Sequence, residues 1–573
     1  MSFCLPKFAA DELRKLLKER QLTPGMLSEM SSAERRQALS VLGAENAKTV
    51  NLLFERKLLL KNQQKAMISW AEQILGLKNK ATPDTIAKVK QMTEIMSEQD
   101  IQKFKEDLIA KKLGLESITQ EEAGRLINLA NTVDKLKPQV EEMYKKDKLT
   151  KEDDLVRAEY GMNLALFKRY VSDLKVKGLD SQVLLGAVKN PGGFSKSIVA
   201  SFDNSFWGNQ GIFTMLNPKY VDLWAKNLIK SFSDMAKELR GLDTTIATEA
   251  DVFSRKGAVD GTYAREKLAI GLRNEEAYPT SLPEKIPLLG RLFGASSAAY
   301  KNAALRLRAD VADRLNKIAE KSGVDLTNKI EAEAIGDLVN SMTGRGGLGR
   351  AEPISPILNN YLFSPRLLRS TFDTLTSHLF NKRTKASAFA MKQAAQNLLG
   401  IAATYMAIIS MYEALNPGST ETDPRGAHFG QVKVGNSWVN ITGPLRPMLR
   451  TLSTLIPSFH NGEYAMWRKT ATGKWMKFEV FPNKAPKYGA IVPLDIAEGF
   501  FEGKASPALA VVLDIWRQKD FNGNPPTPEG EASRLLTPIS IQQYLQDKDN
   551  PNVDDVLKNT ILNALGFSAS TPK

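Results

Sequence analysis

The sequence predicts a mainly α-helical, elongated, multi-domain protein with a small C-terminal region that contains β-hairpins. Helix-capping patterns recur through the first third, and apolar residues follow the 3.6-residue period through the first two thirds. After about residue 420 the composition changes, because prolines become dense and short segments alternate around glycine turns. The chain has 573 residues, which is long for one core, so we expect two to four domains.

The clearest helix starts are capping boxes, in which a hydroxyl oxygen accepts a free N–H and a glutamate three residues later reaches back. Ser31 with Glu34 and Thr119 with Glu122 fit this pattern, and Thr82-Pro83 is a cap followed by a proline in the first helical position. The patterns together predict helices over about 10–21, 31–43, 46–76, 218–239, 296–322, 332–342 and 365–415.

Two breaks and two hairpins divide the rest of the chain. Pro191-Gly192-Gly193 precedes a run crowded with aromatic residues, and a second break contains three prolines between residues 279 and 287. Alternation around Gly435-Asn436 and around Thr472-Gly473 predicts two β-hairpins. We therefore predict an N-terminal helical domain, a central helical region, a basic helical region and a mixed C-terminal region, over 1–115, 116–290, 291–420 and 421–573.

The charge balance indicates the kind of partner. There are 78 Lys and Arg residues against 64 Asp and Glu residues, a net charge of +14, which favours nucleic acid, an anionic membrane surface or an acidic protein. Cys4 is the one cysteine, so the sequence excludes an intrachain disulfide and thiolate-cluster metal sites. The first residues have no apolar core typical of a secretory signal, and we expect a reducing compartment.

The segment GRGGLG, from Gly344 to Gly349, fits the G-x-G-x-x-G pattern of dinucleotide-binding loops. Such a loop follows a β-strand and opens a helix, whereas here a helical segment precedes it and AEPISP follows. The sequence therefore predicts a helix end followed by a flexible turn. Arg345 and Arg350 could still contact the phosphates of a polynucleotide.

No pattern for catalysis is present in the sequence. The three histidines, His378, His428 and His460, are far apart and lack the H-E-x-x-H spacing of a zinc site, and neither a nucleophile elbow nor a P-loop occurs. We predict a non-enzymatic protein without catalytic residues, metal, cofactor or small-molecule substrate.

The stretch from Gln393 to Tyr412 holds 20 consecutive uncharged residues, enough to cross a bilayer core as a helix. Its first turn is polar, however, and the 15 residues from Leu398 that remain mostly apolar favour a buried core helix. A conditionally membrane-inserting helix stays open as the alternative. The residues that would insert are Leu398, Ile401, Tyr405, Ile408, Ile409 and Tyr412.

Basic residues gather on both sides of this stretch. Between residues 363 and 450 there are ten Lys and Arg residues against four acids, which suits anionic lipid or nucleic acid, although a solvated basic face is equally consistent. The candidate contacts with nucleic acid or anionic lipid are Arg345, Arg350, Arg366, Arg369, Lys382, Arg383, Lys385 and Lys392.

Several strings together resemble a family of large bacteriophage proteins that carry large polyvalent protein-associated domains. They include LTPGMLSEMSSAERRQAL, SFDNSFWGNQGIFTMLNPKYVDLW, AYKNAALRLRADVAD, VNSMTGRGGLG, FSPRLLRSTFDTL, DPRGAHFGQVKVGNSWVNITGP and GKASPALAVVLDIWRQKDFNGNP. They cover most of the chain in the same order as in the family.

The resemblance implies an internal virion protein, made in the bacterial cytoplasm, that leaves the capsid with the DNA and is delivered to the host envelope. Its expected partners are other virion proteins, sister subunits, DNA bound without sequence preference, and an anionic membrane. Two alternatives stay open: a soluble assembly or scaffold module that contacts proteins alone, and a nuclease or muramidase with an unrecognised site.

Overall fold

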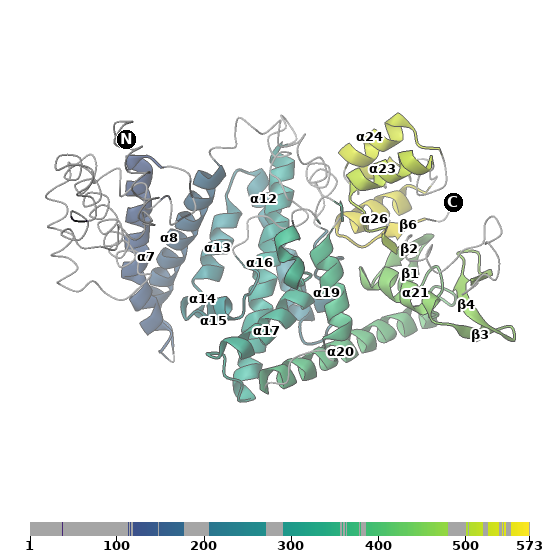
Figure 1. The fold of residues 1–573 in the computed structure, drawn as a ribbon, viewed down its shortest axis with the longest axis horizontal. Coiled ribbons are helices and arrows are strands. Elements are labelled where there is room, and N and C mark those ends of the chain that lie inside the picture. Colours follow the sequence, from purple (N-terminus) through teal and green to yellow (C-terminus); the bar gives the residue numbers. More distant parts are fainter. Residues whose placement is uncertain are drawn as a thin grey trace. The chain divides into compact units, whose positions relative to one another are not determined.

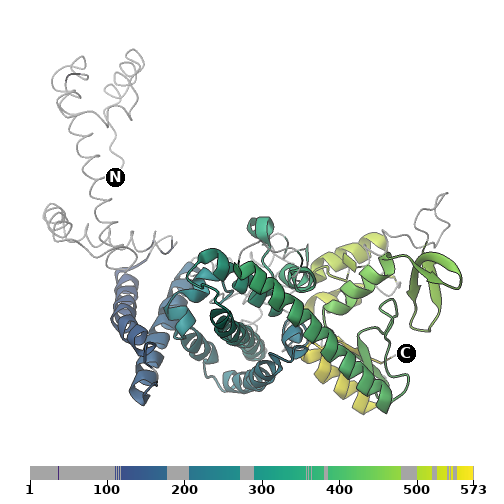
Figure 2. The ribbon, with the colours of Figure 1, turned by 90° about the horizontal axis from the view of Figure 1, so that it is seen from below.

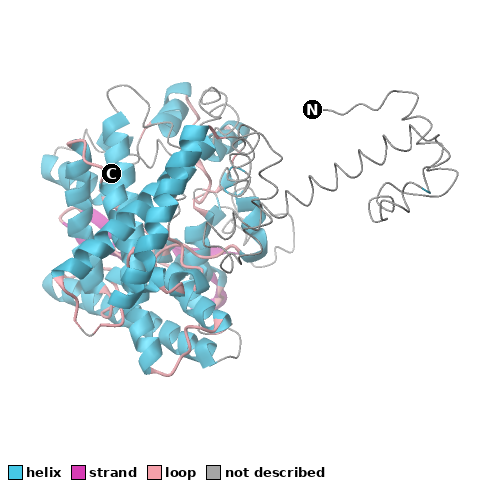
Figure 3. Cartoon of the chain, turned by 90° about the vertical axis from the view of Figure 1, so that its left-hand side faces the viewer, coloured by secondary structure: helices cyan, strands magenta, loops and turns pink. Residues whose placement is uncertain are grey.

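A computed structural model of the chain describes a mainly helical protein, which confirms the predicted fold class. In Figure 3 helices dominate and strands form a minor part. The helices predicted before residue 100 lie outside the described residues. Apart from isolated residues and pairs of residues, the described ranges are 118–146, 148–176, 205–270, 290–355, 364–377, 385–478, 503–518, 525–537 and 552–571.

The chain divides into two compact units. Unit 1 comprises Met1–Lys135 and Phe167–Lys177, and unit 2 comprises Leu136–Leu166 and Gly178–Lys573. Within unit 1, Leu126 belongs to a small core to which Phe167 and Tyr170 add partly buried rings, and the Arg125 guanidinium lies 4.6 Å from the Tyr170 ring centre.

The first described helices confirm one capping prediction. The backbone N–H of Thr119 donates to Glu122 Oε2 over 2.8 Å, and the N–H of Glu122 donates to Thr119 Oγ1 over 3.3 Å, which is a complete capping box. This box opens α7 (Gln120–Met143), which is followed by α8 (Lys151–Val176).

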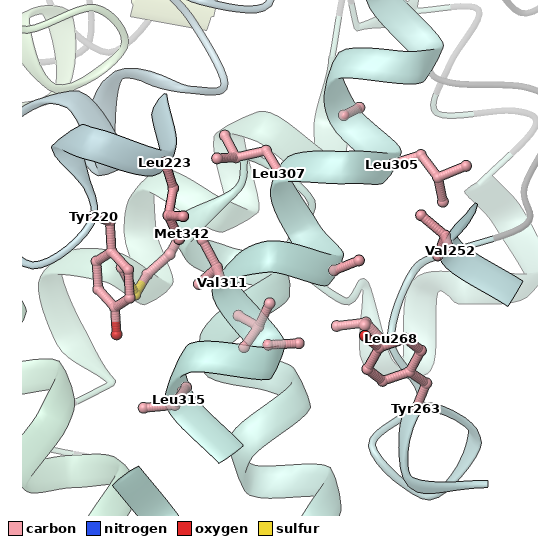
Figure 4. Packing of buried hydrophobic residues seen from close by; sticks show 14 of the residues in the cluster. Tyr220, Leu223, Val252, Tyr263, Leu268, Leu305, Leu307, Val311, Leu315 and Met342 are labelled. Carbon is pink, nitrogen blue, oxygen red and sulfur yellow. The ribbon is translucent and has the colours of Figure 1, made fainter. Parts of the chain in front are cut away.

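The core of unit 2 surrounds α16 (Gly290–Lys321), which is buried on nearly all sides. Leu307, Val311 and Leu315 of this helix lie beside Leu223 and Met342 in Figure 4. Alanines between these residues let neighbouring helices approach closely. This core includes residues on both sides of residue 290, so the boundary predicted there does not separate two cores.

The helices around α16 are short or of medium length, and Figure 1 shows several of them beside it. Their bounds are α11 (Ile212–Met215), α12 (Val221–Leu239), α13 (Thr244–Phe253), α14 (Lys256–Val259), α15 (Thr262–Arg265) and α17 (Lys329–Met342). The other short helices are the 3₁₀ helix η4 (Gly349–Ile354) and the α-helices α21 (Leu445–Leu455), α23 (Pro507–Arg517), α24 (Pro528–Leu536) and α26 (Val553–Ala564).

The single helix predicted from about Pro365 to Leu415 is wrong, because the chain forms two helices there. These are α19 (Pro365–Thr376) and α20 (Lys385–Leu415), and both pack against α17. One straight helix of that length would extend roughly 75 Å and could not place both of its ends on the same short partner.

Both predicted hairpins are confirmed. β1 (Gln431–Val434) pairs with β2 (Ser437–Asn440), and β4 (Glu463–Lys469) pairs with β5 (Trp475–Phe478), in each case antiparallel. Sequence reasoning missed β3 (Ser458–His460) and β6 (Ala569–Ser570). Within the described residues the strands make two three-stranded sheets, ordered β1-β2-β6 and β3-β4-β5.

Candidate functional site

Helix α20 lies along unit 2 with one face against the protein (Figures 1 and 2). Near its middle, Ile401 packs with Ile212, Phe213 and Leu445, and further on Ile409 packs against the β1–β2 hairpin. Buried or half-buried positions therefore recur every three or four residues, as expected for one helical face.

The polar first turns of α20 fix its start to the body of unit 2. Asn397 accepts a 3.0 Å hydrogen bond from Asn217 Nδ2 and donates to the Met342 sulfur, and Lys219 Nζ donates to Gln393 Oε1 over 3.1 Å. The polar residues that argued against a complete membrane span therefore form packing contacts with unit 2.

The opposite face of α20 is exposed and apolar. Leu399 and Leu415 are each 70% exposed, and the exposed positions between them carry no charge. The other exposed side chains on this face are Ala402, Ala403, Met406, Ala407, Ser410, Met411 and Ala414. The expectation of a buried core helix is therefore wrong, because α20 buries only one side.

The same geometry revises the residues proposed for membrane insertion. Ile401 and Ile409 are buried, and the four others are half-buried on the protein-facing side. Within the described residues, Ala388–Leu415 is the one helix long and apolar enough to cross a bilayer. The residues on its exposed face are not the six residues predicted to insert. Insertion into a bilayer stays a prediction.

The glycine loop GRGGLG is a packing junction. A Cβ on Gly344, whose φ is +77°, would overlap the Gln210 side chain, and a Cβ on Gly346 would overlap the backbone of α19 at Ser370. The Gly346 N–H also donates to Arg366 O over 3.1 Å. The predicted helix end is confirmed, since α17 ends at Met342. The turn after it is packed at Gly344 and Gly346, where glycine is required for close approach, and a 3₁₀ helix follows at Gly349.

Most described residues of the predicted basic contact set already have protein partners. Arg345 is buried, which corrects its proposed role as a surface phosphate contact, while Arg366 pairs with Glu352 and Arg369 pairs with Asp373. Lys392 is exposed at the start of α20. Lys382 and Arg383 lie outside the described residues, as do the side chains of Arg350 and Lys385.

A polar network crosses the core between α13, α15 and α16. Arg255 Nη1 lies 2.7 Å from Asp310 and 3.2 Å from Asp313, and its Nη2 lies 2.8 Å from Asp251. The Tyr263 hydroxyl donates to Asp313 over 2.5 Å. Burial is the largest cause that raises the pKa of Asp313, and it is also the largest cause that raises the pKa of Tyr263. These groups satisfy one another, which is the arrangement of a structural network.

Two arginines of α16 also form buried structural contacts. Arg306 Nη1 lies 2.6 Å from Asp234, and Arg308 Nη1 donates to the Ala269 carbonyl over 2.9 Å. Both guanidinium groups are buried, so neither reaches a partner at the surface.

Arg446 and Arg450 of α21 form a second basic cluster with Arg468 of β4. Sequence reasoning counted the first two in the basic stretch between residues 363 and 450 but did not predict this cluster. Arg446 Nε donates to the Phe429 carbonyl over 2.9 Å, and its Nη2 donates to Gln431 Oε1 over 3.0 Å. Burial is the largest cause that lowers the pKa of Arg446 to about 10, and Arg468 adds to it. The four-residue spacing of Arg446 and Arg450 on one helix was the signal available in the sequence.

Arg450 has fewer side-chain contacts with the protein than Arg446 has. Within the described residues, its buried Nε has no hydrogen-bond partner and no carboxylate forms an ion pair with it. Burial, followed by the charges of Arg446 and Arg468, lowers its pKa to about 10. The nearby Glu421 already pairs with Lys469 at 3.2 Å, so the three arginines keep an excess of positive charge.

The histidines do not come together as ligands. His428 stacks on Trp438 with ring centres 4.0 Å apart, and His460 lies between Trp467 and Trp475. Among the described residues, no group of three or more His, Cys, Asp or Glu side chains is placed to hold a metal ion.

Comparisons of the chain with protein-family models, with curated proteins and with solved structures found no match.

Proposed function

We propose that the chain is a non-enzymatic structural protein of a bacteriophage particle that acts as a multimer in genome delivery. The resemblance to phage virion proteins, which extends in order over most of the sequence, supports a location in the phage particle. The mainly helical fold and the net charge of +14 agree with an internal protein that contacts DNA, sister subunits and an anionic membrane.

The exposed apolar face of α20 is the observation that carries the proposal. It runs over 17 residues, 399–415, and is therefore about 25 Å long. Soluble monomers rarely leave a continuous uncharged face of this kind in water. Since the other face is packed on unit 2, insertion of the whole helix into a bilayer would break those contacts, whereas a second subunit covers the face without any rearrangement.

A second copy of α20, antiparallel to the first, fits the side chains of this face. With Ala407 at the two-fold axis, Leu399 lies opposite Leu415, so that two leucines meet at each end of the contact. Ala403 lies opposite Met411, so that a small side chain meets a large one there. Alanines and a serine at the other exposed positions let the two backbones approach closely, which strengthens dispersion contacts. We infer that sister subunits meet through α20.

Mass spectrometry of purified phage particles tests the place of action. A virion protein remains in mature particles in a fixed copy number, whereas an assembly scaffold is absent from them. Incubation of the purified chain with DNA and with peptidoglycan tests the enzymatic alternatives, and the proposal predicts that neither substrate is cleaved.

A further inference from the structure

The β3–β4 hairpin presents exposed apolar side chains at its tip. Asn461 and Gly462 form its two-residue turn with φ of +49° and +80°. Phe459 and Tyr464 pair across the strands beside this turn and are 75% and 63% exposed. A hairpin tip of this composition is costly in water unless a partner covers it.

The tip and the basic cluster lie on the same side of the sheet. Side chains two residues apart along a strand share a face, so Tyr464, Met466 and Arg468 point in one direction from β4. Met466 is buried in the same cluster as Leu455 of α21, which places that helix over this face. Tyr464 and Arg468 are therefore about 13 Å apart along the strand, with apolar groups at one end and basic groups at the other.

We propose that this surface, made of Phe459 and Tyr464 with Arg450 and Arg468, docks on an anionic lipid bilayer. The aromatic tip enters the interface between headgroups and acyl chains, where amphipathic rings are favoured, and the arginines meet the lipid phosphates above it. The inference rests on the proposed function, which it deepens by naming the part of the chain that contacts the host membrane.

The aromatic tip and the arginines together indicate which partner binds this surface. Arg450 and Arg468 have no carboxylate partner among the described residues, and their guanidinium groups match phosphodiester oxygens, which accept paired hydrogen bonds. Nucleic acid would satisfy these arginines but would leave Phe459 and Tyr464 in water. A bilayer with anionic headgroups satisfies both ends together.

Co-sedimentation of the full-length chain with vesicles tests the docking surface. The chain is mixed at low salt with vesicles of phosphatidylcholine alone and with vesicles that contain phosphatidylglycerol as well. We expect stronger binding to the anionic vesicles. The double substitution Arg450→Gln/Arg468→Gln should weaken that binding about 30-fold, since each basic residue near the surface contributes roughly fivefold. The substitution Phe459→Ser/Tyr464→Ser should weaken binding to both kinds of vesicle.

Matched controls use exposed residues elsewhere in unit 2. Arg240→Gln at the end of α12 and Trp516→Ser on α23 remove one exposed charge and one exposed ring, and both should leave vesicle binding unchanged. Circular dichroism should show that all variants fold. Equal losses in the controls, or no vesicle binding by the wild-type chain at low salt, would overturn the proposal.

A binding measurement with duplex DNA shows whether the arginines bind the phosphates of nucleic acid instead of those of lipid. If Arg450→Gln/Arg468→Gln weakens DNA binding and leaves vesicle binding intact, the cluster binds nucleic acid and the inference is wrong. Failure of the docking surface is distinct from failure of the proposed function. A chain found in mature particles that binds no vesicles contradicts this inference alone, and a chain that binds vesicles but is absent from particles contradicts only the virion assignment.

Discussion

At the scale of single residues, Gly336 sets how closely α17 approaches the segment after α15. A Cβ at this position would overlap the main-chain carbonyl of Glu266, which cannot move aside as a flexible side chain would. Gly336→Ala should therefore lower the free energy of unfolding by about 1–3 kcal/mol through overpacking. The midpoint of denaturant unfolding measures this change.

Gly294 in α16 is the matched control, since nothing in the described structure lies within 4 Å of a Cβ there. Gly294→Ala should raise the stability by roughly 0.5–1 kcal/mol, because alanine restricts the unfolded chain and favours helix. Equal effects of the two substitutions would mean that close packing at Gly336 does not matter.

Glu266 makes the stability of unit 2 depend on pH. Its side chain is fully buried, and burial is the largest cause that raises its pKa to about 8, with Asp313 and Asp260 adding to this and Asn316 and Arg265 opposing it. The folded state therefore keeps a proton that the unfolded state releases above about pH 4.3. Stability from this group is full below that pH and declines as pH rises towards 8.

The substitution Glu266→Gln should remove this dependence. Relative to the wild-type chain, the variant should gain stability with rising pH, by at most about 1.4 kcal/mol per pH unit. Denaturant unfolding of both chains at pH 5.5 and pH 7.5 gives the comparison. The same difference in stability at the two pH values would show that Glu266 does not hold the proton.

At the scale of elements, the exposed face of α20 should be sensitive to charge. Ala407→Glu places a carboxylate at the centre of the inferred contact, where two copies would bring two like charges together without water. We expect the multimer to dissociate to monomers in analytical ultracentrifugation, with the helical content unchanged. Ala225→Glu, at an exposed position of α12, is the control and should leave the sedimentation coefficient as in the wild-type chain.

Local chemistry explains which elements could be predicted. The Thr119 capping box and the hairpin at Gly435-Asn436 depend on residues close in sequence, and both are present. The β3–β4 turn has the signal Asn461-Gly462, which is a strong hairpin dipeptide that sequence reasoning overlooked. The break between α19 and α20 arises from packing of both helices on α17, and nothing in their own apolar spacing reveals it.

The candidate site shows the same limit. An uncharged helix was visible in the sequence, but which of its faces is exposed depends on Ile212, Phe213 and the β1–β2 hairpin, which pack against it from elsewhere in the chain. The burial of Arg345 likewise follows from glycines that close the loop onto Gln210 and α19. The number of basic residues in the sequence therefore overestimates the positive charge at the surface, because some of these residues are buried or form ion pairs within the protein.

At the scale of the whole molecule, binding to duplex DNA should be independent of sequence and should weaken steeply with salt. The net charge of +14 provides phosphate contacts, and no base-reading motif is visible. Replacing Lys382, Arg383 and Lys385 with glutamine should reduce the slope of log K against log salt by about 2–3. An unchanged slope in filter-binding titrations would move the contact elsewhere, and no binding at low salt would exclude DNA as a partner.

Cysteine cross-linking of the full-length chain tests the central claim, that sister subunits meet through antiparallel α20 helices. The native Cys4 is first replaced by serine, and single cysteines are then placed at Ala407, Leu399 or Leu415. Under mild oxidation Ala407→Cys should form disulfide-linked dimers, and a mixture of Leu399→Cys with Leu415→Cys should form mixed dimers. Leu399→Cys alone should not, since its two copies would lie about 24 Å apart along the helices. Self-cross-linking at residue 399 as efficient as at residue 407, or no cross-link at any of these positions, would contradict the account.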